Sequence, residues 1–485
     1  MLKNYQTGMF FDEMMETDGK PKQHYKYFYD LVSDFSKDEL REKHDTAQLS
    51  FLRQGITFTV YNDTGGMERT MPFDFVPVII PDKQWTKIER GMKQRMKALN
   101  CFLEDIYNRQ EIVNDGIIPE VLIRHNPYYY KQVTGVEIPL NNHIFLAGID
   151  LIRDENGDYL VLEDNLRNPS GMSYVFQNRY VMRQVYPELF FQHSIQTLEH
   201  QFKDLHGALV SHVPANSMNP EAPTAVLLTP GMYNSAYYDH VFLAQQIGIE
   251  LVEGRDLVVE DNKVYMKTIR GLKRIDIIYR RIDDDFLDPE SFRPDSTLGV
   301  KGLMRAYHKG NVAILNGIGN GIADDKAMYA YVPDMIRYYL DEDPILSNVN
   351  TYFLRDPEQL EYVLENIETL VVKNVSASGG YDMLIGPHAR EEEINEFRKK
   401  IVETPSQYIA QPAIKLSRAP AYQQGRFYPC HVDLRVFVMN GSSTHVVPGG
   451  LSRVALKEGS LVVNSSQGGG GKDTWILSEG DDVHA

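Results

Sequence analysis

Cysteine is nearly absent from the chain, with only Cys101 and Cys430 among 485 residues. This scarcity argues against a disulfide-stabilised scaffold and is typical of proteins in a reducing compartment. Long apolar runs are also missing, because residues 75–80 fall far short of the roughly 20 residues that a membrane-spanning helix needs. Residues 1–11 contain one lysine and no apolar stretch of signal-peptide length. These absences predict a cytoplasmic protein with no membrane partner.

Basic residues are outnumbered by acidic ones. Fifty Lys and Arg residues stand against 67 Asp and Glu residues, so the formal net charge is −17. Such a chain repels nucleic-acid phosphates, and nucleic acid is therefore not an expected partner. Hydrophobic residues make up 42% and charged residues 24%, as in ordinary globular proteins. The length exceeds what one hydrophobic core supports, so we expect roughly two to four domains.

Apolar periodicity and turn residues predict alternating helices and strands, which is the α/β class. Helices are expected over residues 84–114, 179–201, 237–247 and 325–340. Strands are expected over residues 56–61, 144–152, 159–162, 225–228, 249–252, 275–279, 312–315, 370–373, 408–411, 432–439, 445–447 and 460–464. A polar segment with three prolines, residues 214–223, is the best linker candidate.

Two glycine-rich segments resemble phosphate-binding loops but fail in their details. In residues 468–473, Asp473 stands where a Walker A loop requires Ser or Thr, and no helical pattern follows. In residues 317–321 the last glycine comes one residue too early for a dinucleotide loop, and no ribose-binding acid follows at the expected distance. The histidines show no HExxH spacing, and neither cysteine lies in a thiol-enzyme signature. None of these four kinds of site is predicted.

The first block with chemical content is the predicted hairpin between residues 144 and 165. Glu163 and Asn165 are two residues apart, so on a strand their side chains leave the same face. Together with Asp150 from the paired strand, they offer the hard oxygen ligands that Mg²⁺ prefers. A surface hairpin with polar residues facing solvent explains the same pattern equally well.

Two lysines form the next candidates. Lys373 ends a predicted buried strand, and the small residues at 376–380 that follow suit a flexible loop whose backbone amides cover phosphates. An ordinary lysine before a hairpin turn is an equally good explanation. Lys326 opens a predicted helix behind Asp325, and a capping acid followed by a surface lysine explains that pair without any function.

A further pair, Asp433 and Arg435, shares one face of a predicted strand, and Arg453 follows a Pro-Gly-Gly turn. An ion pair within that face is the alternative to a functional role.

Taken together, these residues resemble the ATP-grasp superfamily. Its members typically show a lysine at a helix start, a lysine before a glycine loop, a hinge strand that holds adenine, Asp-x-Arg with a later arginine, and Gly-x-Asp followed by Glu-x-Asn. The matching positions here are Lys326, Lys373 with residues 376–380, the hinge at 408–414, Asp433 with Arg435 and Arg453, and Asp150 with Glu163 and Asn165.

The order of these motifs is unusual, because the magnesium block precedes the lysine blocks. Chance resemblance and circular permutation both explain the order, and permutation is easy where chain ends lie close together. The order resembles the circularly permuted ATP-grasp type 2 family, which is glutathionylspermidine synthase-like. Residues 168–174, 279–283 and 465–475 are also similar to that family, and the resemblance spans residues 60–476. One departure is Gln411, which stands at a hinge position where many relatives have glutamate.

The resemblance implies an α/β (α+β) architecture, namely a circularly permuted ATP-grasp fold with a Rossmann-like pre-ATP-grasp domain. The expected parts are a mixed helix-and-strand region at 1–143, the magnesium-binding half at 144–215, the Rossmann-like domain at 216–322 and the lysine and glycine-loop half at 323–485.

The resemblance also implies an ATP-dependent carboxylate–amine ligase that works through an acyl phosphate, with ATP and Mg²⁺ as cofactors. Its substrates would be a small-molecule or peptide carboxylate and an amine. A non-catalytic nucleotide-binding scaffold of the same fold is the alternative, whereas a fused cysteine amidase is disfavoured by the two cysteines.

Each matching residue acquires an implied role. Those that hold Mg²⁺ are Asp150, Glu163 and Asn165; those that bind the nucleotide are Lys326, Lys373, Ser376, Ser378, Gly379, Gly380, Gln411 and Ile414; those that act on the transferred phosphoryl group are Arg435 and Arg453. Candidates for the acceptor carboxylate are Arg167, Arg179, Arg280 and Arg281. Pairing with the acids at 283–285 explains Arg280 and Arg281 equally well.

Overall fold

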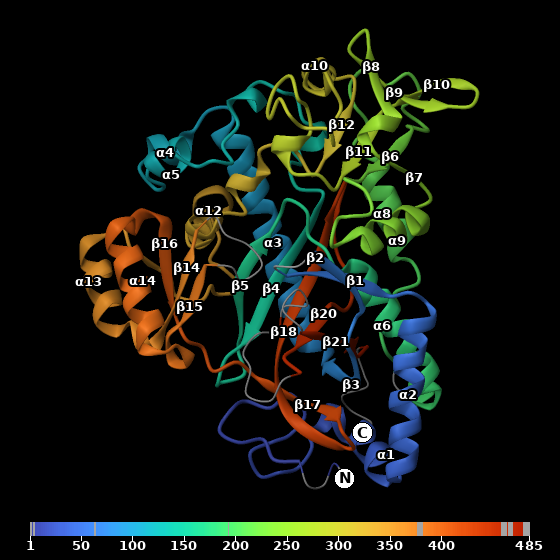
Figure 1. Ribbon diagram of the computed structural model, residues 1–485, viewed down its shortest axis with the longest axis vertical. Helices are drawn as coiled ribbons and strands as arrows, with labels where there is room; N and C mark the ends of the chain where they lie inside the picture. Colours follow the sequence, from blue (N-terminus) through green and yellow to red (C-terminus); the bar gives the residue numbers. More distant parts are fainter. Residues whose placement is uncertain are drawn as a thin grey trace.

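The computed structural model describes residue 2 and residues 5–62, 65–192, 194–375, 382–456, 463 and 469–478, without the side chains of 58–62, 65–68 and 192. Three bodies are visible in Figure 1: a large central sheet, a parallel sheet above it and a smaller helix-covered sheet beside it. Candidate site residues come from all three bodies, with Arg280 and Arg281 at the end of a strand of the parallel sheet.

The central sheet has the strand order β3-β21-β20-β18-β4-β5, and β17 and β19 also pair with β18. Its pairings are antiparallel except that of β21 with β3. Every residue of β3, β4 and β21 is buried, because helices cover the sheet. The strands are β3 (Phe73–Ile80), β4 (Leu146–Arg153), β5 (Tyr159–Asn165), β17 (Arg418–Gln423), β18 (Arg426–Asn440), β19 (Thr444–Val446), β20 (Leu451–Val454) and β21 (Gly470–Ile476).

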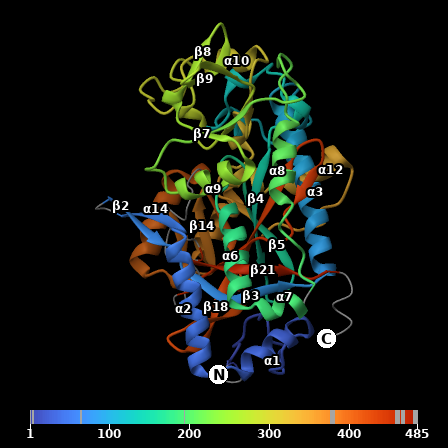
Figure 2. The same cartoon turned by 90° about the vertical axis from the view of Figure 1, so that its right-hand side faces the viewer.

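The long strand β18 shows how the two faces are filled. Val436 and Val438 join the hydrophobic cluster of α3 (Asp82–Ile106), whereas Phe437 and Met439 join the cluster of α6 (Met172–Val185). Since successive residues of a strand point to opposite faces, α3 and α6 cover opposite sides of the sheet. Figure 2 shows α6 beside α2 (Lys37–Arg53); α6 packs on β3 and β21, and α2 packs on β3.

The second body contains a four-stranded parallel sheet in the order β12-β11-β6-β7, with an antiparallel three-stranded sheet, β10-β9-β8, beside it. Helix α9 packs on β6 and β7, and α8 packs on β11. Its assignment as a Rossmann-like pre-ATP-grasp domain stays a prediction. The elements are α8 (Gln201–Val210), β6 (Ala225–Leu228), α9 (Tyr237–Ile247), β7 (Glu250–Val252), β8 (Leu257–Glu260), β9 (Lys263–Thr268), β10 (Gly271–Ile275), β11 (Ile277–Arg280), α10 (Leu303–His308) and β12 (Ala313–Leu315).

The third body is an antiparallel sheet in the order β13-β16-β14-β15 with two covering helices. Its buried side chains, among them Leu370, Val372 and Ala410, form a hydrophobic cluster of their own. This body therefore packs as a unit that carries Lys373 and Gln411. Its elements are β13 (Tyr352–Phe353), α13 (Pro357–Asn366), β14 (Leu370–Asn374), β15 (Met383–Ile385), α14 (Glu391–Glu403) and β16 (Tyr408–Pro412).

Most predicted elements are confirmed, and the differences occur mainly at helix ends. The helix predicted over 179–201 begins earlier, at Met172, and ends at Val185, because a proline at position 187 disfavours helical backbone before it. The predicted strand 460–464 lies outside the described residues except for position 463. The remaining elements are α1 (Lys26–Asp34), β1 (Thr57–Asn62), β2 (Gly65–Thr70), α4 (Glu111–Asn114), α5 (Val121–Arg124), α7 (Pro187–Gln192), α11 (Lys326–Tyr329) and α12 (Val332–Leu340).

Within the described ranges, no helix combines the length and the apolar character that crossing a bilayer requires.

Candidate functional site

A row of charged residues crosses the central sheet on the α6 side. Glu163 of β5 lies opposite Asp150 of β4, which lies opposite Arg435 of β18. Neighbours in register share a face, so three strands place their charges in one line. Asp433 and Arg453 lie opposite each other on β18 and β20 and extend the row.

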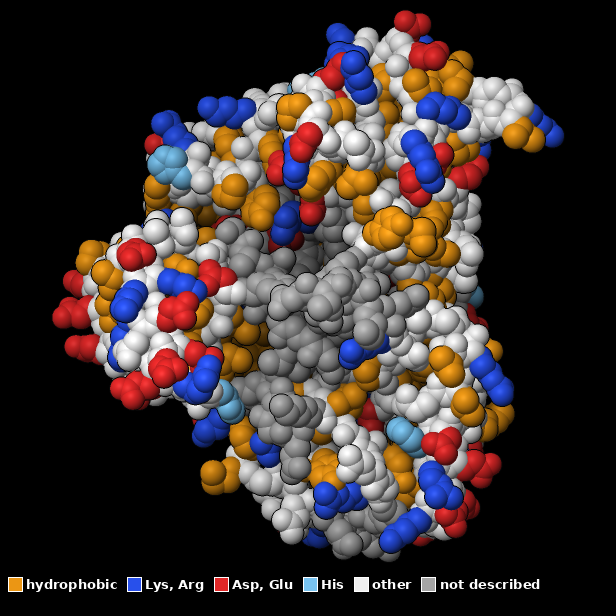
Figure 3. Space-filling view, viewed as in Figure 1, with side chains coloured by type: hydrophobic (Ala, Val, Ile, Leu, Met, Phe, Trp, Pro, Cys, Tyr) orange, Lys and Arg blue, Asp and Glu red, His pale blue; other side chains and the backbone are white. Residues whose placement is uncertain are grey.

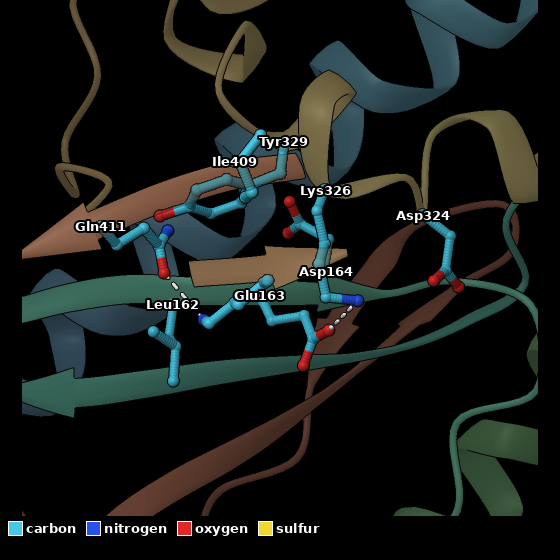
Figure 4. Close-up of a pocket in the computed structure, with 9 residues that line it drawn as sticks. Leu162, Glu163, Asp164, Asp324, Lys326, Tyr329, Ile409 and Gln411 are labelled. Carbon is cyan, nitrogen blue, oxygen red and sulfur yellow. Dashed lines mark hydrogen bonds and ion pairs between the residues drawn. The ribbon is translucent and has the colours of Figure 1, made fainter. Parts of the chain in front are cut away.

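A small pocket lies where this row meets the third body. Its lining combines residues of β5 with residues from α11, β14 and β16, and it encloses about 250 Å³ that includes open solvent. Figure 4 shows the lysine side chain of position 326 pointing at Glu163. The lining residues are Leu162, Glu163, Asp164, Asp324, Lys326, Tyr329, Lys373, Ile409 and Gln411. The structure thus brings together the blocks that are distant in sequence.

Lys326 enters the pocket from the first position of α11. Asp325 caps this helix, because its Oδ1 accepts hydrogen bonds from the backbone N–H groups of Ala327 and Met328. The capping explanation is therefore confirmed for Asp325. Lys326 itself is no ordinary surface lysine, since its side chain is only 16% exposed and its Nζ lies 3.1 Å from Oε1 of Glu163.

Lys373 reaches the same pocket from β14. Its Nζ donates a hydrogen bond of 2.7 Å to Oε1 of Gln411, whose Nε2 donates to Oγ1 of Thr351. Burial lowers the pKa of the Lys373 ammonium to about 8, the positive charge of Lys326 adds to this effect, and the carboxylate of Glu163 opposes it. The pocket lining therefore combines two lysines with three acids, of which Glu163 is paired with Lys326 and Asp164 with Arg95.

Asp150 is engaged by both candidate catalytic arginines. Its carboxylate accepts two hydrogen bonds from Arg435, of 2.6 and 2.8 Å, and one of 2.8 Å from Arg453, which also binds Asp433. Burial raises the pKa of Asp150, but the two guanidinium groups outweigh it and hold the pKa at about 2. Both the ion-pair explanation and a catalytic position next to the pocket are compatible with this geometry.

The donor set on β5 fits a hard cation. Glu163 and Asn165 project from one face, and Nδ2 of Asn165 is buried without a hydrogen-bond partner among the described residues. Mg²⁺ takes few protein ligands and prefers oxygen, so the ligands on offer here are the carboxylate of Glu163 and the amide oxygen of Asn165, while the unpaired Nδ2 is a donor and supplies none. No group of three or more His, Cys, Asp or Glu side chains arranged for a metal occurs in the described part of the chain. Glu163 and Asn165 are thus the fitting pair, and the arginines occupy Asp150.

The remaining predicted residues fall into three groups. Ser376, Ser378, Gly379 and Gly380 lie outside the described residues. Ile414 lies in the connection between β16 and β17 and does not line the pocket. The four candidate acceptor arginines lie just after β5 (Arg167), in α6 (Arg179), and at and just after the end of β11 (Arg280 and Arg281). Different partners surround each guanidinium group.

Three residues that hold the site together are not apparent from the sequence patterns. Oδ2 of Asp324 accepts hydrogen bonds from the backbone N–H groups of Leu166 and Arg167, which fixes the end of β5 to the start of α11. Arg95 of α3 binds both carboxylate oxygens of Asp164 at 2.6 Å on the other face of β5. Paired acids at 324–325 are the one sequence signal for this network.

The glycine-rich segments that were rejected as nucleotide loops have structural roles. Lys472 is buried in β21, and its Nζ donates hydrogen bonds to a carboxylate oxygen of Asp74 and to the carbonyl oxygen of Pro420. After β12, the side chains of Asn316 and Asn320 donate hydrogen bonds to the carbonyl oxygen of Leu166. The described residues in and beside both segments thus form hydrogen bonds that connect strands of the core.

Residues 77–455 match the circularly permuted ATP-grasp type 2 family, and the chain belongs to this family. The chain is 49% identical over 477 residues to an uncharacterized protein of Synechocystis sp., with 98% of each chain covered. It is 48% identical over 471 residues to an uncharacterized protein of Mycobacterium tuberculosis, covering 97% of this chain and 84% of the relative. It is 42% identical over 479 residues to the Frankia casuarinae protein named "Putative glutamate--cysteine ligase 2-2", covering 98% of this chain but only 54% of that protein.

Proposed function

We propose that the protein is an ATP-dependent ligase that joins a carboxylate to an amine. The family match and the name of the Frankia relative, of which the chain spans about half, support an ATP-dependent ligase. The observation that carries the proposal is the junction of Lys326 with Glu163, with Lys373 lining the same pocket. This junction would provide both cations for phosphates and oxygen ligands for Mg²⁺ around one small space.

In the proposed reaction, an oxygen of the acceptor carboxylate attacks the γ-phosphorus of ATP. The bond between that phosphorus and the β–γ bridging oxygen breaks, and ADP leaves with the bonding electron pair. The amine then attacks the carbonyl carbon of the acyl phosphate, an amide bond forms, phosphate departs, and the amine proton passes to solvent or phosphate. The family resemblance favours glutathionylspermidine synthase-like chemistry, but the pocket residues specify only the ATP half of the reaction.

Each part of the site has a task in this proposal. Lys326 and Lys373 bind the β- and γ-phosphates, and each charge-assisted hydrogen bond contributes about 1.5–3 kcal/mol. Glu163 and Asn165 would hold Mg²⁺, which would neutralise phosphate charge when bound. Arg435 and Arg453 stabilise the charge on the transferred phosphoryl group, while Asp150 and Asp433 keep both guanidinium groups in place.

The direct test is phosphate release from ATP and magnesium in the presence of amino acids, peptides and polyamines. Release that requires both a carboxylate and an amine is the expected outcome. Nucleotide binding without release under any of these mixtures would instead support a binding scaffold of the same fold.

A further inference from the structure

The four arginines considered for the acceptor carboxylate differ in how much of their hydrogen-bonding capacity the protein uses. Arg280 is fully buried and donates to the carbonyl oxygens of residues 282, 316 and 317 and to Asp284. Arg179 donates to Asp473 and to the carbonyl oxygens of residues 196 and 474. These two guanidinium groups hold the fold together and have little capacity left for a ligand.

Arg281 is also unsuitable for direct contact. Its side chain is 1% exposed, and it donates to Oη of Tyr279 and weakly, at 3.4 Å, to the carbonyl oxygen of Asn168. Through the hydrogen bond to Asn168, it supports the loop that follows β5. A ligand cannot reach it without displacing that loop.

Arg167 is different, because its guanidinium group has no hydrogen-bond acceptor among the described residues. Its side chain is 19% exposed, its Nε is buried and unpaired, and the nearest carboxylate oxygen, Oδ2 of Asp324, lies 3.6 Å away. The guanidinium group lies 4.4 Å from the centre of the Tyr128 ring, which fixes its plane without using its N–H groups. Such a group is oriented but still able to bind a carboxylate through two parallel hydrogen bonds.

The position of Arg167 is fixed next to the pocket. Asp324 lines the pocket and binds the backbone N–H of Arg167. On the opposite side, a Cβ atom added to Gly321 would lie 2.8 Å from Cδ of Arg167 and 3.1 Å from Cβ of Tyr128. The absence of a side chain at Gly321 therefore makes room for the stacked arginine. A carboxylate bound by Arg167 would therefore lie near Asp324, one of the residues that line the pocket.

An exposed acid lies beside this arginine. Asp283 accepts a hydrogen bond of 2.9 Å at Oδ1 from Nδ2 of Asn168, the residue next to Arg167. Its Oδ2 has no donor among the described residues, and its charge acts on Arg167. Figure 3 shows that acidic and basic side chains are interspersed over this face of the molecule. Arg167 and Asp283 thus offer a cation and an anion on neighbouring segments, because Asp283 is hydrogen-bonded to the residue that follows Arg167.

We propose that Arg167 and Asp283 bind the two charged groups of an α-amino acid, which is the acceptor in the ligase reaction proposed above. Arg167 binds the carboxylate that receives the phosphoryl group. Asp283 binds the α-ammonium group. A carboxylate that lacks the ammonium group makes one of these two contacts, and an amine that lacks the carboxylate cannot be phosphorylated.

The test measures ATP- and magnesium-dependent phosphate release with each of the twenty amino acids, together with a fixed panel of amines. The best amino acid is then compared with its carboxamide and its N-acetyl derivative. We expect the carboxamide to be inactive and the N-acetyl derivative to show a KM at least tenfold higher. If no amino acid supports release while the protein still binds ATP, this inference is wrong and the nucleotide site stands. If ATP does not bind at all, the proposed function itself fails.

Variants then assign the two contacts. Arg167→Ala should raise the KM of the amino acid at least tenfold and leave the KM of ATP within twofold, and Arg167→Lys should restore part of the loss. Asp283→Asn should raise the KM of the amino acid but leave that of its N-acetyl derivative unchanged, a pattern that a merely structural role would not produce. The exposed residues Arg124 and Asp295 provide matched controls, Arg124→Ala and Asp295→Asn. An unchanged amino-acid KM in a folded Arg167→Ala variant would overturn the proposal.

Discussion

Nζ of Lys326 lies 3.1 Å from Oε1 of Glu163, although the two residues belong to separate blocks of the sequence. Lys326 starts a helix in the late part of the chain, and Glu163 ends an early hairpin. The permuted order of the motifs therefore leaves the two halves of the pocket side by side. The following expectations depend on this junction.

Lys373→Ala should weaken ATP binding strongly. The variant removes a cation that lines the pocket, and the loss of one charge-assisted hydrogen bond of about 1.5–3 kcal/mol corresponds to a roughly 10- to 150-fold higher Kd. Isothermal titration calorimetry with Mg·ATP measures this change. Lys399→Ala removes an exposed lysine of α14 in the same body and should leave the Kd unchanged. Equal affinities of the Lys373→Ala variant and the wild type would refute the assignment.

ATP binding should take up protons near pH 8.5. In the free protein, burial lowers the pKa of Lys373 to about 8, so a large part of its side chains is neutral at that pH. A polyphosphate beside the amine favours the charged form and raises the pKa, which requires proton uptake on binding. The affinity should accordingly fall as the pH rises from 7 to 9.5. Calorimetry in two buffers of different ionisation enthalpy measures the uptake, and its persistence in Lys373→Ala would exclude this lysine as the source.

Glu163→Gln should reduce phosphate release by about 100-fold or more at any magnesium concentration, because it removes a carboxylate from the proposed metal pair. Binding of metal-free ATP should not weaken, since the same change releases Lys326 from its ion pair. Glu155→Gln alters an exposed acid in the turn of the same hairpin, paired with Lys415, and should have no effect. Full activity of Glu163→Gln with unaltered magnesium dependence would contradict the role.

Asp150→Asn should destabilise the fold, because it leaves the buried Arg453 and the largely buried Arg435 without their shared carboxylate. Breaking a buried ion pair on one side costs about 3–5 kcal/mol, which urea denaturation at pH 7 would detect. The pKa of Asp150 is lowered to about 2, from about 3.9 when unfolded, so its contribution is present above pH 4 and is lost as the pH falls toward 2. Asp18→Asn, in an exposed pair with Lys20, should change stability little. A variant at position 150 that is as stable as the wild type would show that the pairs contribute nothing.

Local sequence patterns predict many of the helices and strands of the fold. The hairpin of β4 and β5, the strand β6 and the helix α9 form where turn residues and apolar periodicity predict them. The long helix expected over 179–201 was wrong, since one proline and the packing of α6 against β21 decide where the helix ends and begins.

The sequence predicted which charged residues belong to the candidate site, but it did not predict which of them bind one another. The resemblance to the ATP-grasp superfamily predicted Lys326, Lys373 and Glu163 as residues of one nucleotide site, and all three line one pocket. It could not show that two arginines occupy Asp150, or that Arg95 of α3 binds Asp164, because such contacts depend on how distant elements pack. Nor could it separate Arg167 from Arg280, since the difference lies in how many carbonyl oxygens surround each guanidinium group.

The hydrogen bond from Lys373 to Gln411 joins two strands of one small body with its own core. Glu163 belongs to the central sheet, which is a different body. A nucleotide that contacts both lysines and the acids of β5 would therefore link the two bodies across their interface. Part of its binding energy would then stabilise the packing of the two bodies against each other. Added nucleotide should therefore slow proteolysis of the segments at the interface between the two bodies more than proteolysis within either body.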